Sequence, residues 1–76
     1  MEWNKIEDAP KDGTTVWLCW FDGKDGPFDV CKMYYDQNIT NKLFPGVSGF
    51  WTVKGGSVTW LDDKDFGGPT HFAWVQ

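Results

Sequence analysis

Turn-forming residues interrupt this sequence so often that only short elements fit between them. Nine Gly and four Pro are spread over the 76 residues, and no long stretch keeps the apolar spacing of a helix. The pieces between the turns are rich in aromatic and β-branched residues, which is typical of strands. The sequence therefore predicts a mainly β protein, with at most one short helical turn in residues 35–43.

The extended pieces are long enough for a small antiparallel sheet. Residues 14–21 are apolar at both parities, so we expect a central strand that is covered on both faces. Two hairpins and a terminal strand favour a five-stranded, SH3-like barrel, and a single curled sheet is the alternative, since both protect strand edges. The predicted strands are residues 14–21, 28–35, 50–53, 58–61 and 71–75, with residues 3–6 as a short edge segment.

The length predicts one small β domain spanning residues 1–76. A domain of this size buries only about 60% of its unfolded surface, so each core side chain matters. Six Trp, six Phe and two Tyr compensate for a small number of aliphatic residues. The two cysteines cannot form a multi-disulfide scaffold. A symmetric first hairpin, closed by residues 22–26, would place Cys19 opposite Cys31 as neighbouring reduced thiols.

The longest connection, residues 36–49, is polar and contains Gly and Pro. It exceeds the usual loop length, so we expect it to be functional or partly structured. It overlaps the one window that tolerates a helix, where Asn38 and Asn41 weaken helix formation and Pro45 ends it.

The charge argues against several classes of partner. The net charge is −4, and all seven cations are Lys, so no Arg fork is present to read bases or clamp phosphate. We therefore expect no direct nucleic-acid binding, although the acidic surface leaves nucleic-acid mimicry open. No apolar run matches a membrane span, and the N-terminus has no signal-peptide pattern. We expect no membrane partner and a cytoplasmic location in a host cell.

No catalytic or metal-binding constellation is evident. His71 is the only histidine and has no obvious nucleophile or further ligand beside it. The acids of residues 62–65 lack the spacing of a calcium loop, and the Gly pairs do not match phosphate-binding loops. We expect a protein that is not an enzyme and needs no cofactor or metal.

The tryptophans are the strongest indication of a binding surface. Trp17 and Trp20 point to opposite faces of a strand, so at least one of the six Trp should be partly exposed, unless all six fill the core. Exposed aromatic side chains on a small domain anchor protein partners or stack on sugars. The candidate aromatic and acidic binding surface consists of Trp20, Tyr34, Tyr35, Phe44, Asp62, Asp63 and Asp65.

Three blocks of the sequence form a recognisable set. Residues 3–13 read W-x-x-I-x-x-A-P-K-D-G, residues 49–51 read G-x-W, and residues 69–72 read P-T-H-x. Together they resemble small phage and prophage proteins of the family of unknown function numbered 551, of which this chain looks like a divergent member. That family has no established activity. The resemblance implies a phage or prophage origin and a first strand that lies close to the last one.

These observations lead to one expected function and two alternatives. We expect a phage- or prophage-derived, non-catalytic accessory protein that binds a host or phage protein, as an inhibitor of a host defence or regulatory complex. A small carbohydrate-binding module or a virion-associated structural module, using exposed Trp, is the alternative. Self-association into a homo-oligomer also stays open.

Overall fold

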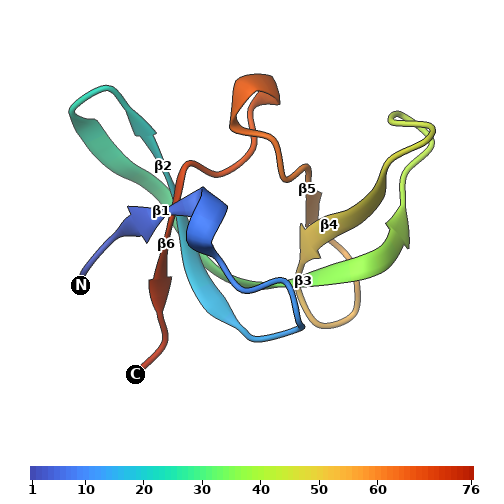
Figure 1. Ribbon diagram of the computed structural model, residues 1–76, viewed down its shortest axis with the longest axis horizontal. Coiled ribbons are helices and arrows are strands. Elements are labelled where there is room, and N and C mark those ends of the chain that lie inside the picture. The colour runs from blue at the N-terminus through green and yellow to red at the C-terminus, as the bar shows by residue number, and fades with distance from the viewer.

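The computed structural model describes residues 1–76 and contains six strands in one antiparallel sheet (Figure 1). The order in the sheet is β1-β6-β2-β3-β4-β5, so the prediction of a mainly β, antiparallel fold is confirmed. The sheet is curled but not closed, because β5 at one edge does not pair with β1 at the other. The strands are β1 (Asn4–Lys5), β2 (Val16–Asp22), β3 (Asp25–Thr40), β4 (Ser48–Thr52), β5 (Thr59–Trp60) and β6 (His71–Trp74).

The long strand β3 joins two halves of the sheet. Residues 25–33 pair with β2, whereas residues 34–40 pair with β4. Figure 1 shows β1, β6 and β2 on one side and β4 and β5 on the other, with β3 running between them. We call these the first wing and the second wing. Because β3 crosses from one to the other, both wings face a shared interior.

The core fills that interior. Register places Val16 opposite Met33 and Leu18 opposite Phe72, so these side chains share one face of the first wing. Trp51 comes from the second wing and is fully buried. Burying each large apolar side chain contributes about 1.5–3 kcal/mol, so a few such residues support a chain of this length. The main core cluster is Ile6, Val16, Leu18, Met33, Trp51 and Phe72.

The two ends of the chain pair with each other. β6 lies between β1 and β2. Phe72 of β6 pairs with Asn4 of β1 on one side and with Leu18 of β2 on the other. The backbone N–H of Ile6 also donates to the carbonyl of Thr70 at 3.1 Å. The adjacency that the sequence resemblance implied is therefore present, and it turns the predicted edge segment into a sixth strand.

The first hairpin closes more tightly than the sequence predicted. Its turn is only Gly23 and Lys24, because Asp22 already pairs with Asp25. Two register shifts then follow in β3, and Asp29 adopts a positive φ of 53° beside one of them. Each shift moves the pairing by one residue, so Cys31 lies opposite Leu18. The predicted pairing of Cys19 with Cys31 is wrong.

Half of the connection over residues 36–49 is strand. Residues 35–43 contain no helical turn, because β3 continues to Thr40 and Tyr35 pairs with Trp51 across the sheet. The loop is thereby reduced to residues 41–47. The only helical elements are two 3₁₀ turns elsewhere, η1 (Ile6–Asp8) and η2 (Lys64–Phe66).

Candidate functional site

Trp20 of β2 contacts β5, the edge strand of the second wing, with which β2 does not pair. Its ring packs edge-to-face on Trp60 of β5, with centroids 5.1 Å apart and an interplanar angle of 65°. Its indole N–H donates to the carbonyl of Gly67 at 2.8 Å. On the next strand, Phe28 lies opposite Trp20. One side chain of β2 thus connects three segments that are far apart in the sequence.

Each of the three segments that Trp20 connects carries an aromatic residue that is exposed to solvent. Phe28 is 49% exposed, Trp60 is 40% exposed, and Phe66, which precedes Gly67, is 74% exposed. Leaving rings of this size in water is unfavourable unless a partner covers them. We call Trp20, Phe28, Trp60 and Phe66 the seam surface.

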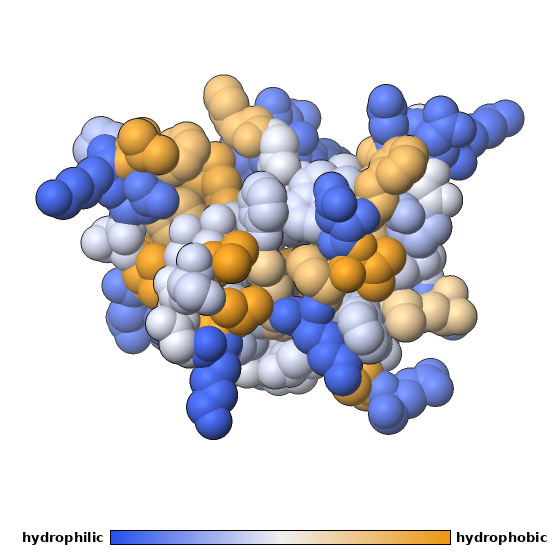
Figure 2. All heavy atoms as spheres, turned by 180° about the vertical axis from the view of Figure 1, so that it is seen from behind, coloured by the Kyte–Doolittle hydropathy of each residue, from blue (hydrophilic) through white to orange (hydrophobic).

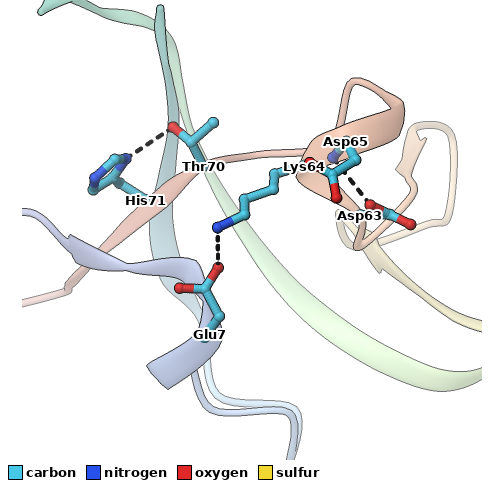
Figure 3. Close-up of polar contacts among 6 residues, drawn as sticks. All are labelled: Glu7, Asp63, Lys64, Asp65, Thr70 and His71. Carbon is cyan, nitrogen blue, oxygen red and sulfur yellow. Dashed lines mark hydrogen bonds and ion pairs between the residues drawn. The ribbon is translucent and has the colours of Figure 1, made fainter. Parts of the chain in front are cut away.

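The segment beside the seam surface is acidic. Asp63 caps η2 by accepting the backbone N–H of Asp65 at 3.0 Å, and Asp65 is exposed. Lys64 is turned away from both and reaches Glu7 of η1 at 2.7 Å, as Figure 3 shows. The hydrogen bond from Lys64 lowers the pKa of Glu7, and the same contact raises the pKa of Lys64. Because Glu7 neutralises Lys64, η2 presents mainly negative charge.

Asp62, the first acid of this segment, stabilises the fold through two contacts. Its carboxylate accepts the indole N–H of Trp51 at 2.9 Å and forms an ion pair with Lys11. The Lys11 ammonium also lies 5.4 Å from the ring centre of Tyr35, which packs edge-on against Trp51. This closed set of contacts fastens the loop after η1 to the second wing. Asp62 therefore does not belong to the acidic rim of the seam surface.

The structure divides the predicted binding surface between two regions. Trp20, Asp63 and Asp65 lie in or beside the seam surface. Tyr35 belongs to the Lys11 contacts, and Tyr34 pairs with Thr52 of β4 on the second wing. Phe44 lies in the loop of residues 41–47 and tilts against Phe50, with ring centroids 6.3 Å apart. The predicted surface is therefore not one continuous patch.

Three members of the seam surface were not identified from the sequence. Phe28 and Trp60 have the sequence pattern of ordinary strand residues, and that pattern does not show that they are exposed. Phe66 had a usable signal, since a large aromatic residue stands alone among acids and glycines in a loop. The prediction that at least one Trp is exposed is confirmed by Trp60 and Trp74.

Other apolar residues reach the surface separately. Leu43, at the tip of the 41–47 loop, is 81% exposed. Figure 2, which views the molecule from behind, shows hydrophobic residues in several places, with hydrophilic side chains projecting between and around them. Around Trp20, a ring contact and a hydrogen bond connect the segments that carry the exposed residues Trp60 and Phe66.

His71 is bound to its neighbour. Its Nδ1 lies 2.8 Å from the hydroxyl of Thr70, the only hydrogen-bond partner of the ring (Figure 3). That hydroxyl also accepts the backbone N–H of Phe21 at 2.8 Å, so it fastens the start of β6 to β2. The Phe21 ring also packs edge-on against the His71 ring, with ring centroids 4.8 Å apart. This arrangement holds two strands together and places no carboxylate on the imidazole.

The remaining reactive groups are dispersed. Burial raises the pKa of the Cys19 thiol to about 11, and nearby Cys31 adds to this effect. Burial likewise raises the pKa of Cys31, with the charge of Asp29 as a smaller cause. Both cysteines are free thiols, and no three His, Cys, Asp or Glu side chains form a group that could hold a metal ion.

Comparisons with protein-family models, curated proteins and solved structures find no match to this chain. The resemblance to the phage and prophage family thus stays a prediction from three short blocks. The structure contains no helix with the length and apolar composition that a membrane crossing requires.

Proposed function

We propose that this chain is a non-catalytic accessory protein that binds another protein through the seam surface. The observation that carries this proposal is that Trp20 connects three segments that each carry an exposed aromatic residue: it lies opposite Phe28, packs on Trp60 and donates to the carbonyl of Gly67, next to Phe66. Large aromatic residues dominate the binding energy of protein interfaces when a partner desolvates them. The fixed position of Trp20 lowers the entropy cost of ordering this surface on binding.

Charge indicates the kind of partner. Asp63 and Asp65 border the seam surface, Asp29 follows Phe28, and the whole chain carries a net charge of −4. A partner with Lys or Arg around an apolar pocket complements this surface, and the charges accelerate its association. We therefore propose a basic protein patch as the docking surface, which makes binding weaker at high ionic strength.

The sequence resemblance supports a narrower proposal for the biological setting. The blocks shared with phage and prophage proteins favour a host or phage protein as the partner. A small acidic protein that covers a basic patch is suited to inhibit a host defence or regulatory complex, because it occupies a surface without needing to react with it.

The test is a binding experiment with matched variants. The chain is immobilised and exposed to bacterial lysate, and retained proteins are identified and quantified against a charge-matched control protein. Combining Trp60→Ala with Phe66→Ala should reduce retention of a specific partner about tenfold or more, the scale of a binding hot spot. Asp65→Asn should weaken binding at low salt and have little effect at high salt.

Trp74→Ala is the control, since it removes another exposed tryptophan, which lies outside the seam surface. The proposal fails if retention by the wild-type chain does not exceed that of the charge-matched protein. It also fails if Trp74→Ala and the double variant reduce retention equally.

A further inference from the structure

Two lysines of this chain lie over aromatic rings, and both of those rings are outside the seam surface. The Lys11 ammonium lies 5.4 Å from the ring centre of Tyr35, and the Lys32 ammonium lies 4.9 Å from the ring centre of Trp17. No lysine lies over any of the four seam rings in this way, and the chain has no Arg. The attraction of the seam rings for a positive charge is therefore not used within the chain.

The carboxylates of η2, beside these rings, also lack a cation. Asp65 directly precedes Phe66, is exposed and forms no ion pair. Asp63 uses one carboxylate oxygen to cap η2, and its other oxygen has no hydrogen-bond partner in the chain. Lys64, which stands between the two acids in the sequence, extends away from them to Glu7 (Figure 3). These two carboxylates can therefore pair with a cation that comes from another molecule.

Trp20 keeps the Trp60 ring close to η2. It packs on the Trp60 ring and donates its indole N–H to the carbonyl of Gly67, the residue that follows η2, so the width of one indole separates the two. Because this N–H is already bonded, the Trp20 side chain has no donor left for a partner. The seam surface thus offers mainly ring faces and carboxylates, and both attract a positive charge.

Arginine matches this combination better than lysine does. Its guanidinium is planar, so one face can stack on a ring while the N–H groups in the plane donate to a carboxylate. Its methylene groups cover apolar surface at the same time. A lysine ammonium is a compact charge that is hydrated more strongly, so it gives up more hydration when it contacts a ring. A neutral apolar segment would cover the rings without using the carboxylates.

We propose that the partner contacts the seam surface with an arginine-rich segment, whose guanidinium groups lie on the rings of Trp60 and Phe66 and pair with the carboxylates of η2. This inference rests on the docking function proposed above and names the chemistry by which the partner is recognised. Exposed cation–ring contacts and exposed ion pairs are each weak. A short arginine peptide should therefore bind with a Kd of roughly 0.1–1 mM.

The experiment titrates the chain at low salt with two capped peptides of equal charge, hexaarginine and hexalysine, and follows the indole N–H signals by NMR. Equal charge gives both peptides the same long-range attraction to a chain of net charge −4, so the ratio of their affinities reports the ring contacts. We expect hexaarginine to bind about fivefold more tightly or better, and to shift the Trp60 signal more than the Trp74 signal.

Variants locate the preference for arginine. Trp60→Ala and, independently, Phe66→Ala should each reduce the affinity ratio about twofold or more, because each removes one ring on which a guanidinium stacks. Trp74→Ala should leave the ratio unchanged, since it removes an exposed indole outside the seam surface. If Trp60→Ala does not fold, Phe66→Ala decides, because the Phe66 side chain is 74% exposed and its loss leaves the core intact.

The proposal is overturned if hexaarginine does not bind up to about 10 mM, well above the expected Kd. Equal affinities for the two peptides also overturn it, as does a loss of the preference in Trp74→Ala as large as that in Phe66→Ala. The lysate experiment separates this inference from the function on which it rests. Specific retention of a partner with equal peptide affinities contradicts the arginine preference alone. An arginine preference without specific retention supports the recognition chemistry and contradicts the docking function.

Discussion

Gly49 is one of the residues on which the second wing depends. Its φ is +98°, and a Cβ at this position would overlap the hydroxyl of Tyr35. The absence of a side chain lets the Tyr35 ring lie against the backbone while its edge meets Trp51. Gly49 and Trp51 are also the fixed residues of the G-x-W block. Their spacing thus has a physical reason, whatever the ancestry of the chain.

Replacing Gly49 should therefore cost more than replacing a glycine in open space. Gly55 is a matched control, because its φ is +94° but a Cβ there meets nothing within 4 Å. We expect Gly55→Ala to lower the free energy of unfolding by about 1 kcal/mol through backbone strain. Gly49→Ala should lower it by roughly 2–4 kcal/mol, since the clash with Tyr35 adds to the strain. Urea denaturation measures both, and equal losses would contradict the prediction.

At the scale of elements, irregular segments are fastened to the sheet by single polar contacts. The loop after η1 depends on Lys11, which pairs with Asp62, and Asp62 in turn accepts the indole N–H of buried Trp51. The Pro-Lys-Asp-Gly stretch of residues 10–13 is typical of a turn. Lys11 in this stretch pairs with Asp62, about fifty positions later, and local sequence cannot show a contact over that separation.

Removing the Asp62 carboxylate should destabilise the fold strongly. Asp62→Ala leaves the N–H of Trp51 without a partner in the core and Lys11 without its counter-ion, so we expect a loss of roughly 2–4 kcal/mol in the free energy of unfolding. Asp62→Asn retains an acceptor for Trp51 and should lose less. Asp65→Ala, on the exposed face of η2, should change the value by about 0.5 kcal/mol or less. Chemical denaturation of the three variants gives the order, and an Asp65 effect as large as that of Asp62 would refute it.

The contact between η1 and η2 should respond to acid. The folded-state pKa of Glu7 is lowered by its hydrogen bond with Lys64, and that of Asp12 is lowered by two hydrogen bonds from Thr14. A carboxylate with a lowered pKa stabilises the folded state above its unfolded pKa, near 4.5 for Glu7. That contribution is lost as the pH falls through the folded value. It should be small and screened by salt, since both Glu7 and Lys64 are exposed.

The measurement is the free energy of unfolding between pH 6 and pH 3, at low and high salt. At low salt, the free energy of unfolding of the wild type should fall below about pH 4.5, and Glu7→Gln should make this fall less steep. Glu2→Gln is the control, because Glu2 has no ion-pair partner. An identical pH dependence for wild type and Glu7→Gln would show that the ion pair contributes nothing to stability.

For the whole molecule, the sequence predicts the strands better than their arrangement. The composition of residues 14–21 and 28–35 was sufficient to identify β2 and half of β3, which extends from residue 25 to residue 40. The register was missed because the positive φ of Asp29 has no signal in the sequence. The seam surface was missed because Trp20 and Trp60 meet only through the curvature of β3. Local pattern thus determines the elements, while bulges and long-range contacts determine which aromatic side chains remain exposed.

The two wings share only β3, and this arrangement predicts uneven stability. β5 has two residues and a single neighbouring strand, and the segment from β5 to β6 contains no strand and is held mainly by side-chain contacts, of Asp62, of Lys64 and of Trp20 with Gly67. Amides in β5 and η2 should therefore exchange hydrogen much faster than those of β2 and β6, which lie inside the sheet.

Trp20→Ala removes both the ring contact with Trp60 and the bond to Gly67. It should accelerate exchange in residues 59–68 by at least tenfold relative to the change in β2 and β6. Trp74→Ala, at the far end of β6, should not alter that ratio. A uniform increase throughout the sheet after Trp20→Ala would mean that the wings unfold as one unit and that the seam is no weaker than the core.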